Sequence, residues 1–199
     1  MRKEMLILGV LVVCAVLTIS CGTTKKEIRI EEPKLAKEFA HAPKWVLDPS
    51  VEKGLVAVGS AKIGKAGMQF ARTEAMANAR DELARMLSVK VKNMVKNFAQ
   101  VTGIGDDETV DRVSSQVSKQ VTSEVLTGSR QKDLWISPNG DVYMLVGIDP
   151  TIVKEMVKEN VRTSYKNDEA LWQLFQAKQS NEELERAVEK EFGQFKGEE

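Results

Sequence analysis

Cys21 is the residue in this chain with the most clearly defined chemistry. It follows a basic start at Met1-Arg2-Lys3, an apolar run over Met5–Ile19 and the small residue Ser20. This order of charge, apolar stretch and small residue is typical of a secretory signal. A thiol directly after the cut can receive a diacylglycerol group, and the amine that the cut exposes can receive an acyl chain. We therefore predict that residues 1–20 are removed and that Cys21 becomes the lipidated N-terminus.

The residues Leu17–Cys21 resemble the bacterial lipobox with one departure, because the lipobox prefers Leu three places before the cysteine and this chain has Thr18 there. The apolar run is shorter than the roughly twenty residues of a membrane-spanning helix. An uncleaved anchor, or a cut elsewhere that leaves Cys21 unmodified, stays open. Since Gly22 is not the aspartate associated with inner-membrane retention, we expect the outer membrane, facing the periplasm. The inner membrane and the cell surface are the alternatives.

The mature chain offers little for catalysis or metal binding. Its single histidine is His41, and Cys14 is lost with the signal, so neither a base–nucleophile pair nor a Cys/His metal set can be assembled. The acidic pairs Asp81-Glu82 and Glu182-Glu183 fall on predicted helices, where neighbours point in different directions. We expect no catalytic residue, no metal site, no disulfide and no cofactor apart from the lipid on Cys21.

The segment Gly59–Ala66 comes closest to a ligand-binding motif. Two glycines five residues apart and Lys65 follow a predicted strand and precede a predicted helix, which is the arrangement of a phosphate loop. The motif GxxxxGK[ST] is not met, because Ala66 lacks the hydroxyl that binds a metal. Tight packing at a strand-to-helix turn is the favoured interpretation, and a small-ligand or enzymatic site at this turn is the alternative.

Charge and length limit the function classes and set the domain layout. Loss of Arg2, Lys3 and Glu4 with the signal leaves 27 basic and 28 acidic residues of the 29 of each in the full chain. No global field attracts nucleic acid, so we predict no nucleic-acid partner. The predicted layout is a signal at 1–20, a lipidated flexible tether at 21–42, a domain at 43–165 and an amphipathic helical tail at 166–199.

The first half of the domain contains a strand and a long helix. Pro43–Val46 predicts an extended start whose Trp45 closes the edge of the core. Gly54–Ala61 is a short apolar run between glycines and predicts a buried strand. A helix follows from Ala66, with small residues every four positions that allow close approach to a sheet, namely Ala71, Ala75 and Ala79. Residues 88–100 fit both a helix and an edge strand, and both stay open.

The second half predicts a helix, a hairpin and a further helix. Valines spaced three and four apart after Asp106 mark one helix face, namely Val110, Val113, Val117, Val121 and Val125. Asn139-Gly140 between apolar arms predicts a β-hairpin, and its second arm is apolar on both faces, as expected of a central strand. Pro150 begins the next helix. The predicted fold class is α+β: a small, mainly antiparallel sheet packed by an Ala-rich and a Val-striped helix, with a C-terminal helical tail.

The tail carries an apolar face on a charged background and predicts two short helices broken near Ser180-Asn181. The candidate anchors on this face are Leu171, Trp172, Phe175 and Phe192. Either the face folds back onto the domain or it docks on a second copy or another protein. Folding back is favoured, because an amphipathic face commonly meets its own core.

Three segments in order resemble the Lpp-twenty lipoproteins, a family of small bacterial envelope lipoproteins that includes a flagellar outer-membrane member. They are Pro43–Val46, Val56–Ala61 and Ala71–Ala84, and the hairpin Asp133–Val146 also fits. The resemblance covers roughly residues 43–161. It implies a compact α+β domain held at the membrane by lipid and working through contacts, with no catalytic residues to carry over. We therefore expect a structural or assembly module of the envelope, with an envelope protein or a second copy as partner.

Overall fold

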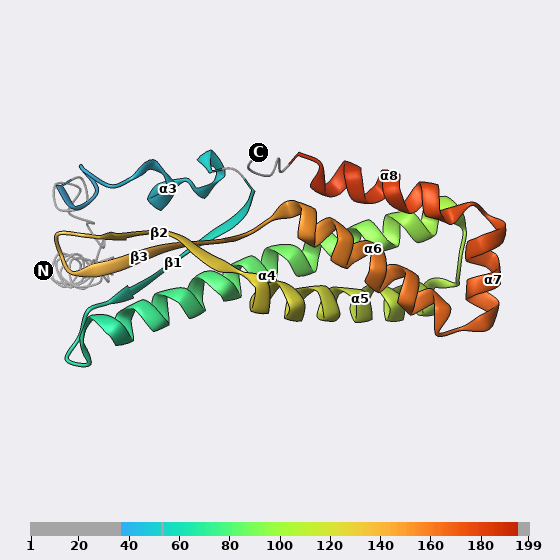
Figure 1. The fold of residues 1–199 in the computed structure, drawn as a ribbon, viewed down its shortest axis with the longest axis horizontal. Coiled ribbons are helices and arrows are strands. Elements are labelled where there is room, and N and C mark those ends of the chain that lie inside the picture. Colours follow the sequence, from blue (N-terminus) through green and yellow to red (C-terminus); the bar gives the residue numbers. More distant parts are fainter. Residues whose placement is uncertain (1–36, 53, 195–199) are drawn as a thin grey trace, which may run out of the picture. The chain divides into compact units, whose positions relative to one another are not determined.

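The computed structural model describes residues 37–52 and 54–194 (Figure 1), so the predicted signal and Cys21 lie outside the described residues. Three antiparallel strands form one sheet in the order β1-β3-β2. They are β1 (Leu55–Lys62), β2 (Arg130–Ile136) and β3 (Asp141–Ile148). Helices α4 (Gly67–Thr102) and α5 (Asp107–Gly128) connect β1 to β2, and α6 (Pro150–Lys166) follows β3. The predicted α+β class is confirmed.

β3 is the central strand of the sheet, and a tight hairpin turn joins it to β2. β3 pairs with β1 from Leu55↔Ile148 to Lys62↔Asp141, and with β2 on its other side. The backbone N–H of Gly140 donates to the carbonyl of Ser137 at 2.9 Å, and Gly140 has a φ of 81° that favours glycine. The buried Ser137 hydroxyl accepts from two N–H groups of the same turn. The Asn-Gly signal thus correctly located the turn.

Helix α4 packs one face of the sheet through its alanines. Ala71, Ala75 and Ala79 are fully buried and share a cluster with the β3 side chains Val142, Met144 and Val146. β1 approaches so closely that a Cβ on Gly59 would overlap the backbone of Ala75 and Ala79. The predicted close contact of an alanine stripe with the sheet is therefore confirmed, and the matching strand residue is a glycine.

Residues 88–100 are helical, as part of α4. The helical spacing buries Val91, Val95 and Phe98, whereas Val89, which a strand pattern would place beside Val91 on the same face, is 61% exposed. Ser88 contacts α5, where its hydroxyl lies 2.9 Å from that of Ser118. Because α5 buries its valines against this same stretch, tertiary packing decides in favour of the helix.

Two capped helices follow the predicted starts. The Asp106 side chain accepts from the N–H of Thr109 at the beginning of α5, and Asp149 accepts from the N–H of Thr151 ahead of Pro150 in α6. Such caps satisfy N–H groups that the helix itself leaves unpaired. The acidic and proline signals therefore marked both helix starts correctly.

The other face of the sheet is covered by residues that precede β1, and here two expectations are wrong. Residues 44–47 form one helical turn, α3 (Lys44–Leu47), followed by the 3₁₀ turn η1 (Pro49–Val51), although Pro43 itself is extended. A proline also suits a helix start, and the Pro43 carbonyl accepts from Val46. The ordered domain also begins before Pro43, because Phe39 lies against Trp135 and Tyr143.

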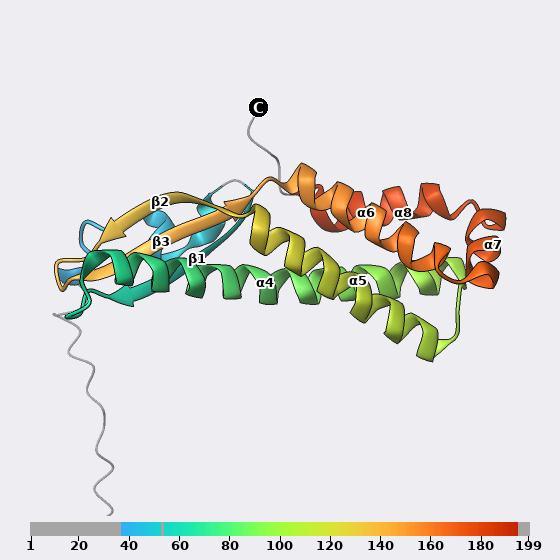
Figure 2. The ribbon, with the colours of Figure 1, turned by 60° about the horizontal axis from the view of Figure 1, so that its bottom comes forward.

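The predicted tail forms two helices, α7 (Glu169–Ala177) and α8 (Ser180–Phe192), as Figure 1 shows. In Figure 2, α8 runs beside α6, and α8 also contacts α4. The break between the helices falls at Lys178 and Gln179, of which Gln179 has a φ of 50°. The tail thus folds back and shares one hydrophobic core with α4, α5 and α6.

Candidate functional site

The N-terminal Cys21 lies outside the described residues, so its modification stays a prediction. Within residues 37–52 and 54–194, no helix is both long enough and apolar enough to cross a membrane. The two named features that the structure does describe are the C-terminal helices and the Gly59–Ala66 turn.

Three of the four predicted tail anchors belong to the core of this chain. Phe175 and Phe192 are fully buried and Leu171 is nearly so. Phe175 packs on Phe98 of α4 and on Tyr165 of α6, with ring centroids 6.0 Å and 5.5 Å apart. In this arrangement these three residues are not available to a partner. The expectation that they form a docking surface is wrong for the folded-back tail, because its own α4 and α6 already cover that face.

Trp172 differs from the other anchors because it stays half-buried. Its ring stacks on Phe175 at a centroid distance of 5.2 Å and an interplanar angle of 15°. The Lys166 ammonium lies over its other side, 5.2 Å from the ring centroid. A cation over an aromatic face stabilises this arrangement. Leu174, on the same helix, is 43% exposed. The accessible large apolar side chains of α7 are therefore Trp172 and Leu174, with Lys166 at the end of α6 beside the tryptophan ring.

Charged contacts fasten α8 to its neighbours. Glu185 pairs with Lys158 and Arg162 of α6, Glu189 pairs with Lys154 at 2.8 Å, and Glu191 pairs with Lys90 of α4 at 2.9 Å. Hydrogen bonds from Lys158 and Arg162, with their positive charge, lower the pKa of Glu185, and the Glu185 hydrogen bond raises the pKa of Lys158. The basic partners are half-buried, whereas Glu185 and Glu189 are exposed. Solvent still screens these pairs, so each contributes modestly alone, and together they fix the position of α8.

Lys178 links the α7–α8 break to the end of α4. Its ammonium donates to the carbonyls of Thr102 and Gly103 at 2.7 Å and 3.1 Å. These carbonyls belong to the last turn of a 36-residue helix, where the helix dipole is negative. A cation there is stabilising, so Lys178 holds the turn of the tail at the end of α4.

The Gly59–Ala66 turn serves packing in this structure. Gly59 meets the backbone of α4, and nothing lies within 4 Å of a Cβ built on Gly64. A shallow open hollow of about 320 Å³ lies between β1 and α4, and Gly59 and Ser60 at the start of this segment line it. Its wall also includes Asn78, which donates to the carbonyl of Ser60 at 2.9 Å, and the ion pair of Arg85 with Glu82. Asn78, Glu82 and Arg85 are therefore each engaged within the protein.

Two titratable groups of the described residues bear on the question of catalysis, His41 and Tyr165. His41 is exposed, and the described residues contain no cluster of three His, Cys, Asp or Glu side chains able to hold a metal. Burial raises the pKa of Tyr165 to about 12. Its hydroxyl has no hydrogen-bond partner among the described residues, in a core lined by Phe98 and Phe175. A protonated phenol surrounded by apolar rings is a structural group.

Two features of this arrangement were not predicted from the sequence. Phe39 belongs to the domain, and its aromatic type within a Lys/Glu-rich stretch was the available signal. The charged residues of α8 are spaced to face α6, yet their partners lie 23 to 101 positions away in the chain. No pattern within the α8 sequence predicts which distant residues these charges pair with.

The arrangement defines a class of protein: a small α+β domain whose helices enclose their own core. A comparison with family models narrows this class, because residues 43–149 match the model described as LPP20 lipoprotein. The match covers more than half of the chain, so the protein belongs to the LPP20 lipoprotein family, and it is a lipoprotein of the cell envelope. The resemblance seen in the sequence is confirmed. A search of curated proteins gives no significant match.

Proposed function

We propose that this protein is a lipid-anchored structural or assembly module of the bacterial envelope, held in the outer membrane and facing the periplasm. The observation that carries the proposal is the family match over residues 43–149, in a chain that starts with a signal pattern ending at Cys21. Diacylglycerol on the Cys21 sulfur and an acyl chain on its amine anchor the protein. Its work is done through contacts rather than catalysis.

The site geometry supports the non-catalytic part of this proposal. Many of the described polar groups are engaged in caps, ion pairs and strand-edge contacts, such as Asn78 with Ser60 and Lys178 with the end of α4. The Gly59–Ala66 turn is used for packing, so a nucleotide-like ligand there is not favoured. The lipid on Cys21 is the covalent group that the function needs.

The proposed protein partner is an envelope complex, such as the flagellar basal apparatus or a cell-wall synthesis machine, or a second copy of this chain. The accessible part of α7, Trp172 and Leu174, is the contact that remains of the predicted tail surface. Aromatic side chains with one exposed edge are common anchors at protein interfaces. Leu171, Phe175 and Phe192 support this surface from the core side rather than meeting the partner.

Cell fractionation tests the anchoring step. Cys21→Ser is expected to leave the protein in the soluble periplasmic fraction or as the uncleaved precursor, whereas wild type fractionates with outer membranes. Cys14→Ser is the matched control, because this thiol lies inside the signal and is removed with it. A mature-sized Cys21→Ser protein in the membrane fraction would contradict lipid anchoring.

Crosslinking in intact cells tests the contact role. Photo-crosslinker at position 172 or 174 is expected to capture an envelope protein or a second copy, and the same group at Lys119, on exposed α5, is not. Lys119 is the control because it lies on a different helix and is also exposed. Equal products from the two helices would show that α7 has no special role.

A further inference from the structure

One end of the sheet gathers exposed apolar side chains next to lysines. The N–H of Ile63 donates to the carbonyl of Gly140 at 2.9 Å, so the end of β1, the hairpin turn and the start of α4 lie together. Phe70 and Met68, in the first turn of α4, are 59% and 37% exposed, and Ile136 at the end of β2 is 40% exposed. We call Lys62, Lys65, Met68, Phe70 and Ile136 the turn-end patch.

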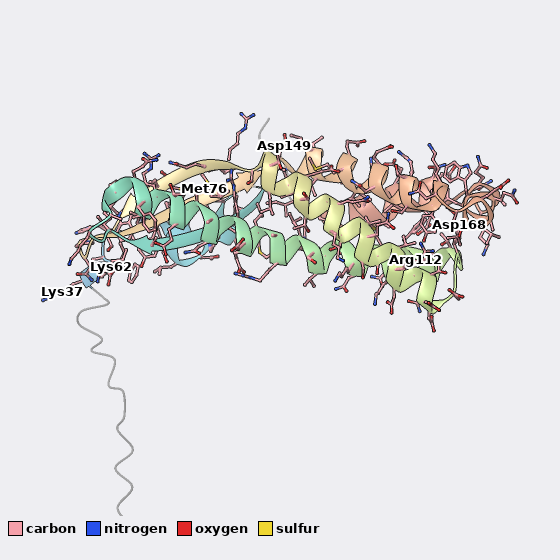
Figure 3. The ribbon with its side chains drawn as sticks, turned by 90° about the horizontal axis from the view of Figure 1, so that it is seen from below. Lys37, Lys62, Met76, Arg112, Asp149 and Asp168 are labelled. Carbon is pink, nitrogen blue, oxygen red and sulfur yellow. The ribbon has the colours of Figure 1, made fainter. Side chains whose placement is uncertain are left out.

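The charge at this end is suited to an anionic surface. Lys62 and Lys65 are exposed, and Figure 3 shows Lys37 at the same end as Lys62. The first turn of α4 contains no acidic residue, and Ala66 offers no side-chain cap, so the positive end of the helix dipole is not neutralised there. Acids near this end include Glu38, Asp141 and Glu74, which lies one turn after Phe70 on α4; Asp141 is paired across the sheet with Lys62.

The chain also leads to this end. Phe39 packs on Trp135 and Tyr143, which lie next to the hairpin turn, so the described chain begins beside the turn-end patch. Fourteen residues lie between Cys21 and Ala36, and the fifteen steps that join the two span at most about 54 Å even when fully extended. The 36 residues of α4 rise by about 54 Å. The turn end is therefore the end from which the chain leads toward Cys21, and Figure 3 shows Asp168 at the opposite, α7 end.

We propose that the turn-end patch is a second membrane contact, which takes an anionic phospholipid surface and orients the domain on it. This rests on the proposed lipid anchor at Cys21. Phe70 and Met68 enter the headgroup region while Lys62 and Lys65 meet phosphate groups, the combination that holds peripheral proteins at an interface. The acyl chains supply the attachment, and the patch sets the direction in which α4 points. The α7 surface, formed by Trp172 and Leu174, then faces away from the bilayer.

Vesicle sedimentation with the mature chain tests this contact without the lipid. Residues 21–199 carrying Cys21→Ser are mixed with vesicles of phosphatidylcholine alone, or of phosphatidylcholine and phosphatidylglycerol at about two to one. We expect sedimentation with the phosphatidylglycerol vesicles only, largely lost at about 0.5 M salt. Phe70→Ser with Met68→Ser, and Lys62→Glu with Lys65→Glu, are each expected to reduce the bound fraction about threefold or more.

Matched controls lie elsewhere on the domain, on α4 and α5. Val89→Ser with Val101→Ser removes apolar side chains that are 61% and 68% exposed, and Lys119→Glu reverses an exposed charge on α5. These are expected to bind vesicles like the parent. Absence of binding to phosphatidylglycerol vesicles, or equal losses in patch and control variants, overturns the proposal. Patch-dependent self-association without vesicle binding also overturns it and assigns the patch to a second copy. None of these outcomes depends on whether Cys21 is acylated in cells, which fractionation decides separately.

Discussion

Gly59 is the single residue on which the contact between sheet and helix most depends. Gly59→Ala would place a methyl group against the backbone of Ala75 and Ala79, which cannot move aside as a flexible side chain would. We expect a loss of about 1–3 kcal/mol in the free energy of unfolding, measured by urea denaturation. Gly64→Ala is the control, since open space surrounds that position. Equal midpoints for the two variants would show that β1 and α4 are further apart than the structure has them.

Tyr165 gives a prediction about alkaline pH. Burial raises the pKa of Tyr165 to about 12, whereas an unfolded chain has a tyrosine pKa near 10. Between about pH 10 and 12 the unfolded state loses a proton that the folded state keeps, so stability falls as pH rises. Tyr165→Phe removes this contribution. Its melting temperature should decline less steeply than that of wild type over this range, and parallel declines would contradict the buried phenol.

The buried and the exposed side of the long helix α4 can be told apart by substitution. Ala75 is fully buried against the sheet and Ala77, on the same helix, is exposed. Ala75→Leu should overpack this contact and cost about 1–3 kcal/mol, while Ala77→Leu should change the free energy of unfolding little. Arg80 also lies away from this face but is unsuitable as a control, because its side chain donates hydrogen bonds to the hydroxyl and the carbonyl of Ser129. Similar losses for the two leucine variants would place a different face of α4 on the sheet.

How much of each element the sequence predicts depends on whether its partners are local. Spacing alone located the buried faces of α4 and α5, since a stripe such as Ala71–Ala79 is defined within one helix. Residues 88–100 stayed ambiguous because a helix and a strand both explain Val91, and only α5 decides between them. Folding back of the tail was the favoured prediction and is observed, but the helices on which α8 packs and the place of Phe39 could not be predicted. An amphipathic face indicates that it is covered, not by what.

At the scale of the whole molecule, the tail is part of the fold rather than an appendage. Deleting residues after Lys166 removes α7 and α8 and exposes the apolar faces of α4 and α6. We expect a markedly lower melting temperature and binding of a hydrophobic dye. Within the full chain, Phe192→Ala should cost about 3–5 kcal/mol, because it leaves a cavity in the core. Leu174→Ala, at an exposed site of α7, should cost little. Unchanged melting after truncation would show that the tail is dispensable for the fold.

The helices that follow the family match are also part of the folded domain. The match to the LPP20 family ends at residue 149, and α6, α7 and α8 follow it. These helices complete the core that α4 and α5 begin, so the extension closes the domain and also presents the α7 surface. If Trp172→Ala loses the proposed protein contact while its melting temperature stays unchanged, the contact and the completion of the core are separate roles of these helices.

The central claim is that Cys21 becomes the acylated N-terminus of an envelope lipoprotein. Mass spectrometry of the intact protein purified from membranes tests it most directly. The account predicts a chain that begins at Cys21, with a mass increased by one diacylglycerol group and one acyl group. Mild alkaline hydrolysis should remove the two ester-linked acyl chains from its N-terminal peptide and leave the glyceryl thioether and the amide-linked acyl chain in place. A membrane protein that still begins at Met1, or a chain cut elsewhere with an unmodified Cys21, would contradict it.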